Sequence, residues 1–365
     1  MKLWAYVLLF SGISFCAGGA VLFERVVFAQ GDNGYNTYRI PALYETKSGV
    51  LLAIAEGRRN GHRDSGDIDI VLRRSFDGGL TWADMQVVWD DGLNTCGNPT
   101  VVQDQSNGRI WLFITHNLGQ DTQAAIEKGA SKGVRTVWSR YSDDDGVTWS
   151  TPVNRFDEVQ PPNVRWDATG PGRGIQLKTG LKAGRLIIPA NGRSIYSDDH
   201  GLTWKQSERL QRGSSESQVV ELSDGTLLRN DRRVGSMKGR AFTKSHDQGD
   251  TWPGTVYRED LPCPKCMGST IAVADGKADG KQLLFFSNPC IDQGDFRRRS
   301  NMTVQVSADD GATWQIKETI YPGASAYSCL SPVGAEHVGL LYENGESNLT
   351  GPELYRRITF AKFAK

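Results

Sequence analysis

The stretch Ser75-Phe-Asp77-Gly-Gly79-Leu-Thr81-Trp82 is the first of five copies of the pattern Ser-x-Asp-x-Gly-x-Thr-Trp in this chain. The other copies span 142–149 (SDDDGVTW), 197–204 (SDDHGLTW), 245–252 (SHDQGDTW) and 307–314 (SADDGATW). Their first serines lie 67, 55, 48 and 62 residues apart. Each interval suits a four-stranded sheet with its loops, so the repeat predicts the blades of a β-propeller.

Each position of the repeat has a physical role in a tight turn followed by a strand. The aspartate accepts hydrogen bonds from the backbone of its own turn, and the glycine supplies the positive φ that such turns need. The threonine and tryptophan begin the next strand, where β-branched and aromatic side chains pack well. The tryptophan is expected to wedge under the turn and lock one blade to the next.

The remaining sequence alternates short apolar runs with Gly, Asn and Asp clusters, which is typical of strands bounded by turns. At the spacing of the repeats, residues 21–365 hold about six blades. No Pro/Ser-rich linker interrupts the repeats, so one domain over 21–365 is expected. The predicted fold is all-β, a six-bladed β-propeller whose last blade combines strands from both ends of the domain.

The charge balance of the chain argues against a nucleic-acid partner. Lys+Arg and Asp+Glu both number 42 among the 365 residues, so the protein has no overall basic field. The neutral total still permits a strongly charged pocket.

The N-terminus predicts a signal peptide over residues 1–20, since Lys2 precedes the apolar run Leu3–Phe15 and small residues follow it. The alternative is an uncleaved anchor extending to residue 23, because the uncharged Leu3–Phe23 is long enough to cross a bilayer core of roughly 30 Å. Both alternatives predict a protein of the secretory pathway, either secreted, lumenal (lysosomal or periplasmic) or at the cell surface. Only the anchor would attach it to a membrane.

The cysteines predict no metal site. Cys263-Pro-Lys-Cys266 has no second pair at zinc-ribbon spacing, and the five histidines are scattered. In an oxidising compartment a disulfide is expected, of unknown connectivity, among the five cysteines that follow the leader: Cys96, Cys263, Cys266, Cys290 and Cys329.

Tyr38-Arg39-Ile40-Pro41 precedes the first expected strand pair and resembles the (F/Y)-R-I-P signature of the sialidase (neuraminidase) superfamily, whose Asp boxes match the repeat described above. The resemblance covers essentially everything after the leader. It implies an exo-α-sialidase with no metal or organic cofactor, acting on terminal sialic acids of glycoproteins, glycolipids or oligosaccharides.

The family binds its substrate's carboxylate with three arginines, and arginine suits this task because its planar fork pairs with both carboxylate oxygens. By resemblance these are Arg39, Arg232 in the N-x-R pattern, and Arg299 in the R-x-N-M-T pattern, with Arg297 and Arg298 as alternatives to the last.

Three further residues are assigned to catalysis by the same resemblance. Asp64 matches the family's acid/base aspartate, in a Gly-rich loop whose closure is expected to raise its pKa. Tyr327, in Ala-Ser-Ala-Tyr-Ser, matches the nucleophile, and Glu216 matches the glutamate that activates it. A neutral phenol is not repelled by the substrate's carboxylate, and sialidases use tyrosine where most retaining glycosidases use a carboxylate.

The resemblance also suggests residues that support the site. Glu343 matches the glutamate that orients Arg39, and Arg58 an additional arginine beside the acid/base loop. Asn98 stands where some relatives carry an aspartate that contacts the 4-hydroxyl group of the sugar. Trp166 and Gln176 are expected near the N-acyl group. Two other functions remain open, a trans-sialidase that transfers to a second sugar and a non-catalytic glycan-binding propeller.

Overall fold

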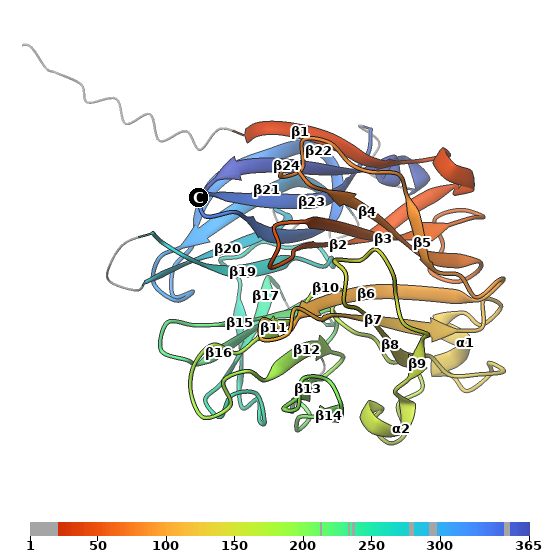
Figure 1. The fold of residues 1–365 in the computed structure, drawn as a ribbon, viewed down its shortest axis with the longest axis horizontal. Coiled ribbons are helices and arrows are strands. Elements are labelled where there is room, and N and C mark those ends of the chain that lie inside the picture. Colours follow the sequence, from red (N-terminus) through yellow and green to blue (C-terminus); the bar gives the residue numbers. More distant parts are fainter. Residues whose placement is uncertain are drawn as a thin grey trace, which may run out of the picture.

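The computed structural model describes residues 21–211, 214–232, 234–235, 238–276, 281–291, 298–346 and 351–365. The predicted leader, residues 1–20, lies outside them, as does Arg297. The described chain is a β-propeller made almost entirely of antiparallel strands, which confirms the predicted fold class (Figure 1). No helix among the described residues has the length and apolarity needed to span a bilayer.

The first half of the propeller consists of three antiparallel runs of four strands. These are β2 (Thr37–Glu45), β3 (Leu51–Arg58), β4 (Ile68–Ser75) and β5 (Gln86–Trp89); β6 (Thr95–Gln103), β7 (Ile110–Asn117), β8 (Thr136–Ser142) and β9 (Val153–Asn154); and β11 (Ile175–Gln176), β12 (Leu186–Ala190), β13 (Arg193–Ser197) and β14 (Lys205–Gln206). The short β10 (Gly172–Arg173) pairs in parallel with β6.

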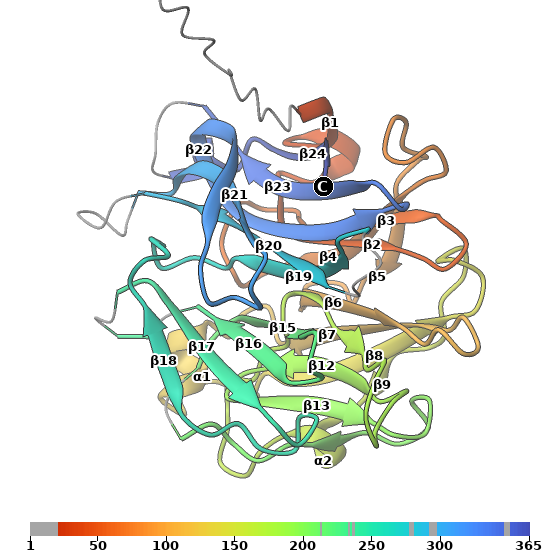
Figure 2. The ribbon, with the colours of Figure 1, turned by 90° about the vertical axis from the view of Figure 1, so that its left-hand side faces the viewer.

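The second half begins with a fourth antiparallel run of four strands, which lie side by side in Figure 2. That run is β15 (Ser217–Glu221), β16 (Leu227–Asp231), β17 (Arg240–Ser245) and β18 (Thr255–Arg258). The remaining strands are β19 (Ser269–Ala274), β20 (Gln282–Pro289), β21 (Ser300–Ser307), β22 (Gln315–Val333), β23 (His337–Asn344), β24 (Arg357–Ala364) and β1 (Val21–Ala29). The helical segments are α1 (Gln123–Glu127), α2 (Phe156–Val159), η1 (Asp32–Gly34) and η2 (Gly351–Tyr355).

The two ends of the domain meet in one sheet, as expected. Strand β1 pairs with β24 from Val21↔Phe363 to Ala29↔Arg357 and lies beside it in Figure 1. The long β22 belongs to two runs, since its first part pairs with β21 and its second part with β23. The shared β22 and a parallel pairing of β4 with β6 merge the runs into sheets of seven, nine, four and four strands. The blade count of six stays a prediction.

The five Asp boxes form the tight turns that the sequence predicts. In the box at 197–204, Ser197 Oγ donates to Asp199 Oδ1 at 2.7 Å, and the Thr203 backbone N–H donates to the same oxygen at 2.9 Å. Gly201 has φ 90°, and a Cβ there would lie 2.3 Å from the Trp111 ring. Trp204 packs edge-on against Trp111 of β7, in the preceding run. The box therefore joins neighbouring blades, as predicted.

Candidate active site

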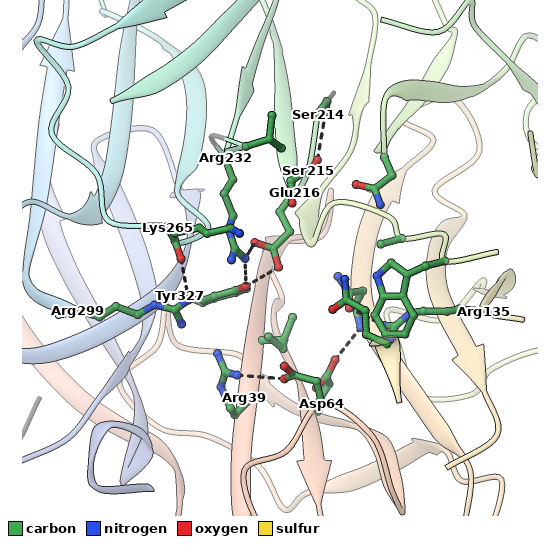
Figure 3. Close-up of a pocket in the computed structure, with 18 of the residues that line it drawn as sticks. Arg39, Asp64, Arg135, Ser214, Ser215, Glu216, Arg232, Lys265, Arg299 and Tyr327 are labelled. Atoms are coloured by element: carbon green, nitrogen blue, oxygen red, sulfur yellow. Dashed lines mark hydrogen bonds and ion pairs between the residues drawn. The ribbon is translucent and has the colours of Figure 1, made fainter. Parts of the chain in front are cut away.

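A cavity of about 800 Å³ is lined by residues of strands β2, β3, β6 and β22 and of the loops beside them. We call it the arginine cavity. Figure 3 shows charged side chains from different blades pointing into it. Its wall contains eight of the nine predicted site residues, Arg39, Arg58, Asp64, Asn98, Glu216, Arg232, Arg299 and Tyr327. The ninth, Glu343, is fully buried beside Arg39.

Arg39 on β2 is held by Glu343 on β23, as expected. Its Nε and Nη2 donate to the two Glu343 oxygens at 3.1 and 3.2 Å, and the Ile40 backbone N–H donates to Glu343 Oε1 at 2.8 Å. The pair is almost dry, since the two side chains are 6% and 0% exposed. Although burial opposes its charge, the Glu343 carboxylate holds the pKa of Arg39 well above its ordinary value. Arg39 is therefore a fixed cation.

Tyr327 on β22 forms the centre of a second contact group. Its hydroxyl donates to Glu216 Oε1 and accepts a hydrogen bond from Arg232 Nη1 at 2.7 Å. Arg232 Nη1 also donates to Glu216 Oε2 at 2.5 Å. Burial raises the pKa of Tyr327 well above its ordinary value, and the Glu216 carboxylate adds to this effect while Arg232 opposes it. The phenol is therefore neutral and has a carboxylate in place to accept its proton.

Arg299 completes the cationic wall of the arginine cavity. Its Nη2 donates to the Lys265 backbone carbonyl at 2.7 Å, and its guanidinium lies 5.5 Å from the Tyr327 ring centroid. Arg39 faces the same ring from 5.1 Å. Because Arg39, Arg232 and Arg299 all approach Tyr327, the wall around it can bind a substrate anion.

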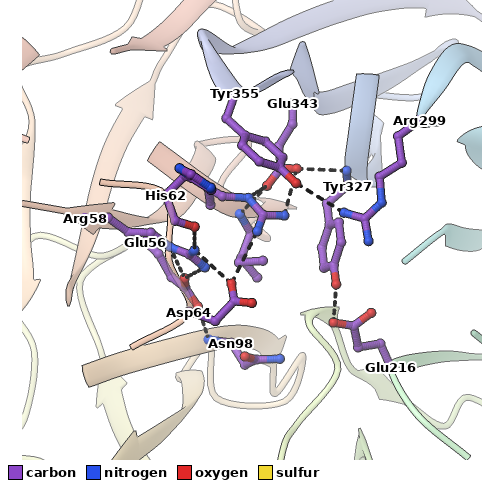
Figure 4. Close-up of polar contacts among 12 residues, drawn as sticks. Glu56, Arg58, His62, Asp64, Asn98, Glu216, Arg299, Tyr327, Glu343 and Tyr355 are labelled. Carbon is purple, nitrogen blue, oxygen red and sulfur yellow. Dashed lines mark hydrogen bonds and ion pairs between the residues drawn. The ribbon is translucent and has the colours of Figure 1, made fainter. Parts of the chain in front are cut away.

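Asp64 lies across the cavity from Tyr327, on the loop between β3 and β4 (Figures 3 and 4). Its Oδ1 accepts from Arg58 Nη1 at 2.8 Å and from Arg39 Nη1 at 3.3 Å, while 69% of its side chain stays exposed. Desolvation by the surrounding walls favours the neutral acid, but Arg58 and Arg39 outweigh it and hold the pKa of Asp64 below its ordinary value. The expected rise in the pKa of Asp64 on closure over a substrate stays a prediction.

Comparison with known proteins places this arrangement in a family. Residues 49–338 match the BNR repeat-like domain. An exo-alpha-sialidase of Aspergillus fumigatus is 33% identical over 359 residues, which cover 90% of this chain and 84% of that protein. The chain belongs to the sialidase superfamily.

Two other matches agree with this assignment. A sialidase of Micromonospora viridifaciens is 36% identical over 349 residues, covering 90% of this chain. The chain spans only 53% of the length of that relative, about half. The solved structure titled Hadza microbial sialidase Hz136 has a TM-score of 0.79 at 33% identity and covers 93% of this chain and 68% of its own.

Within this sialidase-superfamily fold, two buried residues of the site were not predicted. Glu56 accepts from Arg58 Nε at 2.9 Å and from the Asn98 backbone N–H at 2.8 Å. Arg135 Nη2 donates to Asn98 Oδ1 at 2.7 Å, and its guanidinium lies 4.3 Å from the Trp166 ring centroid. The spacing of Glu56 from Arg58 was a usable signal, because residues i and i+2 of a strand share a face. Arg135 carries no such local signal.

Two expectations for this sialidase-superfamily member were wrong. Gln176 does not line the arginine cavity, unlike Trp166; its Nε2 donates to Asp104 Oδ1 and the Gly184 carbonyl at 3.0 and 2.9 Å, on another side of the propeller. The expected disulfide is also not formed, because all five cysteines after the leader are free. Cys96 and Cys329 lie on β6 and β22, whereas Cys263 and Cys266 lie in the loop before β19 and Cys290 directly follows β20.

Among the described residues, no group of three or more His, Cys, Asp and Glu side chains is placed to hold a metal ion. The donor set of the arginine cavity is instead dominated by guanidinium groups, which repel cations and attract anions.

Proposed function

We propose that this protein is an exo-α-sialidase that hydrolyses terminal α-linked sialic acids from glycoproteins, glycolipids and oligosaccharides with retention of configuration. One observation carries the proposal. The hydrogen-bonded Tyr327–Glu216 pair and the Asp64 carboxyl face one cavity whose wall also contains Arg39, Arg232 and Arg299. That cavity has an anion site, a neutral nucleophile with its base, and a separate acid.

The three arginines bind the substrate's carboxylate. Arg39 stays charged because Glu343 compensates it, and Arg232 is compensated by Glu216. Each keeps its guanidinium at the cavity wall. Since the partners are fixed before substrate arrives, little reorganisation accompanies binding.

Tyr327 acts as the nucleophile. Its oxygen forms a bond to the anomeric carbon while its proton passes to Glu216, already in hydrogen-bond contact. The glycosidic C–O bond breaks, and Asp64 donates a proton to the departing oxygen. Water then attacks the anomeric carbon and the bond between that carbon and the Tyr327 oxygen breaks. Asp64 takes the proton of that water, and Glu216 returns its proton to the departing Tyr327 oxygen.

Asp64 must hold a proton for the first step, although Arg58 and Arg39 favour its charged form in the free protein. The substrate's carboxylate changes this balance, because it pairs with Arg39 and removes part of that attraction. The glycan also covers the 69% of the Asp64 side chain that is exposed. Both effects raise the pKa of Asp64, so substrate binding prepares its own general acid.

The test is release of 4-methylumbelliferone from its sialic acid conjugate. Tyr327→Phe retains the aromatic ring and is expected to lower kcat by about 10⁴-fold, on the scale of losing an activated nucleophile. Tyr321→Phe is the control, because Tyr321 lies on the same strand and its hydroxyl donates to the Gly345 carbonyl instead. An inactive native protein between pH 4 and 8 overturns the enzyme assignment, and full activity of Tyr327→Phe overturns the mechanism.

The fate of the sialyl group distinguishes hydrolysis from transfer. We expect free sialic acid as the product, both with and without a large excess of lactose as acceptor, when products are followed by NMR. Sialylated lactose as the main product assigns the protein to the trans-sialidases instead.

We also propose that the protein enters the secretory pathway, with residues 1–20 removed. The support is the sequence pattern of Lys2, an apolar run and small residues. Sequencing the N-terminus of the protein recovered from its native source tests this proposal. A start near residue 21 agrees with it, an intact leader on a membrane-bound protein supports the anchor, and an intact leader on a cytosolic protein overturns both.

A further inference from the structure

A second cavity, which we call the far cavity, has about the same size as the arginine cavity, at about 780 Å³. Strands β2 and β22 line both cavities. In β2, Arg39 faces the arginine cavity and Tyr44 the far cavity; in β22, Tyr327 and Pro332 are divided in the same way. The far cavity therefore lies at the opposite end of the central strands.

A buried polar layer separates the two cavities. Gln218, which is 1% exposed, accepts from Ser269 Oγ at 2.9 Å and donates to the Pro171 carbonyl at 3.2 Å. The backbone of Gly172 packs directly against this layer and leaves no room for a side chain. A Cβ there would lie 2.3 Å from Gln218 Nε2 and 3.2 Å from Cys329 Sγ. The far cavity is therefore a site separate from the arginine cavity.

The wall of the far cavity is apolar in its centre. Val219 and Val220 of β15 and Ile271 of β19 line it and are 2–5% exposed. Its one acidic lining residue, Glu221, is occupied, because it accepts from the backbone N–H groups of Lys178 and Thr179 at 2.7 and 3.0 Å. Two backbone donors thus stabilise the charge of this carboxylate, so it needs no cation of the lining as a partner.

The far cavity also contains a guanidinium with unused donors. Arg173 on β10 lies 4.5 Å from the Tyr44 ring centroid, and its Nη1 donates to Ser331 Oγ at 2.7 Å. Within the described part of the chain, Arg173 makes no ion pair within 4.0 Å. Lys178 adds a second cation to the lining. Glu45, outside the lining, interacts with Arg173 through charge without a direct ion pair. An apolar wall beside a guanidinium that no carboxylate pairs with directly is complementary to an anion with an apolar body.

We propose that the far cavity binds a small amphipathic organic anion, whose acidic group pairs with Arg173 and whose apolar part packs on Val219 and Ile271. This site is independent of the proposed sialidase activity and does not rest on it.

The test uses 8-anilinonaphthalene-1-sulfonate, a fluorescent anion with an apolar body, titrated onto the full chain. We expect saturable binding of one dye per protein, displaced by octanoate. Arg173→Met keeps an apolar side chain of similar length and should weaken binding at least about tenfold, as expected for one charge-assisted hydrogen bond. Arg74→Met is the control, because Arg74 also lies over an aromatic ring, Phe76, but on the outer surface.

Competition separates the far cavity from the arginine cavity. A saturating amount of 2-deoxy-2,3-didehydro-N-acetylneuraminic acid should leave dye binding unchanged; displacement would place the dye in the arginine cavity and overturn the proposal. Equal affinity of native protein and Arg173→Met overturns it as well. Should Arg173→Met fail to fold, Lys178→Glu replaces it, since Lys178 is exposed and charge reversal there must also weaken binding.

Discussion

The Asp boxes and the arginine cavity hold their carboxylates in different ways. In the box at 142–149, Asp144 accepts hydrogen bonds from Ser142 Oγ, the Thr148 backbone N–H and Thr148 Oγ1, all within four residues. Behind the wall of the arginine cavity, the buried Glu343 is held by Arg39, 304 positions away. A local contact forms with its own turn, whereas a distant one exists only after the whole ring has closed.

This difference separates stability from activity. The box contacts are repeated and occur at the surface, so each contributes a small part of the folding free energy. The cavity contacts are single and partly or fully buried, and they leave charged groups pointing into the cavity. Substitutions in the boxes should therefore affect stability alone, and substitutions at Asp64 activity alone. Glu343 should affect both.

The largest effect is expected for Asp64→Asn, which removes the general acid. It should lower kcat/KM for 3′-sialyllactose by about 10²–10⁴-fold. The loss should be much smaller for the 4-methylumbelliferyl conjugate, because that leaving group departs with less need of a proton. Asp67→Asn, in the same loop but paired with Arg59 at 3.2 Å, is the control. An equal loss on both substrates would refute the role of Asp64 as acid.

The sequence predicted the boxes well because their interactions are local. The positions of the aspartate and glycine follow from the turn alone, and the five copies reinforce one another. For the cavity, the sequence supplied candidates only through a family resemblance, which correctly placed Arg39 beside Glu343 and Tyr327 beside Glu216. No local pattern of this chain contains those pairs.

What the sequence missed comes from contacts that exist only in the folded ring. Arg58 and Arg39 reach Asp64 from two strands and lower its pKa, which the sequence of its loop does not show. Gln176 was placed in the wrong cavity because β10 carries the chain past the buried layer, so Trp166 and Gln176 lie on opposite sides of it.

Glu343→Gln should disturb both properties. It leaves the buried Arg39 guanidinium without its compensating charge, so we expect the free energy of unfolding to fall by on the order of 3 kcal/mol. KM should also rise, because Arg39 loses its fixed position. Urea unfolding and steady-state kinetics measure the two effects. Asp260→Asn, which breaks an exposed ion pair with Arg258, should change stability by less than about 1 kcal/mol. Equal stability of the two variants would contradict the buried-pair argument.

Asp144→Ala should change stability without changing activity. The loss of three hydrogen bonds to a surface carboxylate is expected to cost about 1–2 kcal/mol. The adjacent Asp143→Ala is a matched control, because Asp143 makes only an exposed ion pair with Arg109. Kinetics measured below the unfolding transition should give native kcat/KM for both variants. A tenfold loss of kcat/KM in Asp144→Ala would show that box and cavity are coupled.

The smallest expected effect is the acid response of a single box. The Thr313 hydroxyl and then its backbone N–H lower the pKa of Asp309 from 3.8 to about 2. Because the folded pKa lies below the unfolded one, this carboxylate stabilises the fold above about pH 4, and the contribution disappears as pH falls toward 2. Asp309→Asn keeps the shape of the turn but does not titrate. Its unfolding free energy, measured in urea at pH 5 and pH 2.5, should therefore fall less between the two pH values than that of the native protein. The other four boxes still titrate, so the difference between the two proteins in this fall should be small. An identical fall in both proteins would mean that the pKa shift of Asp309 contributes nothing to stability.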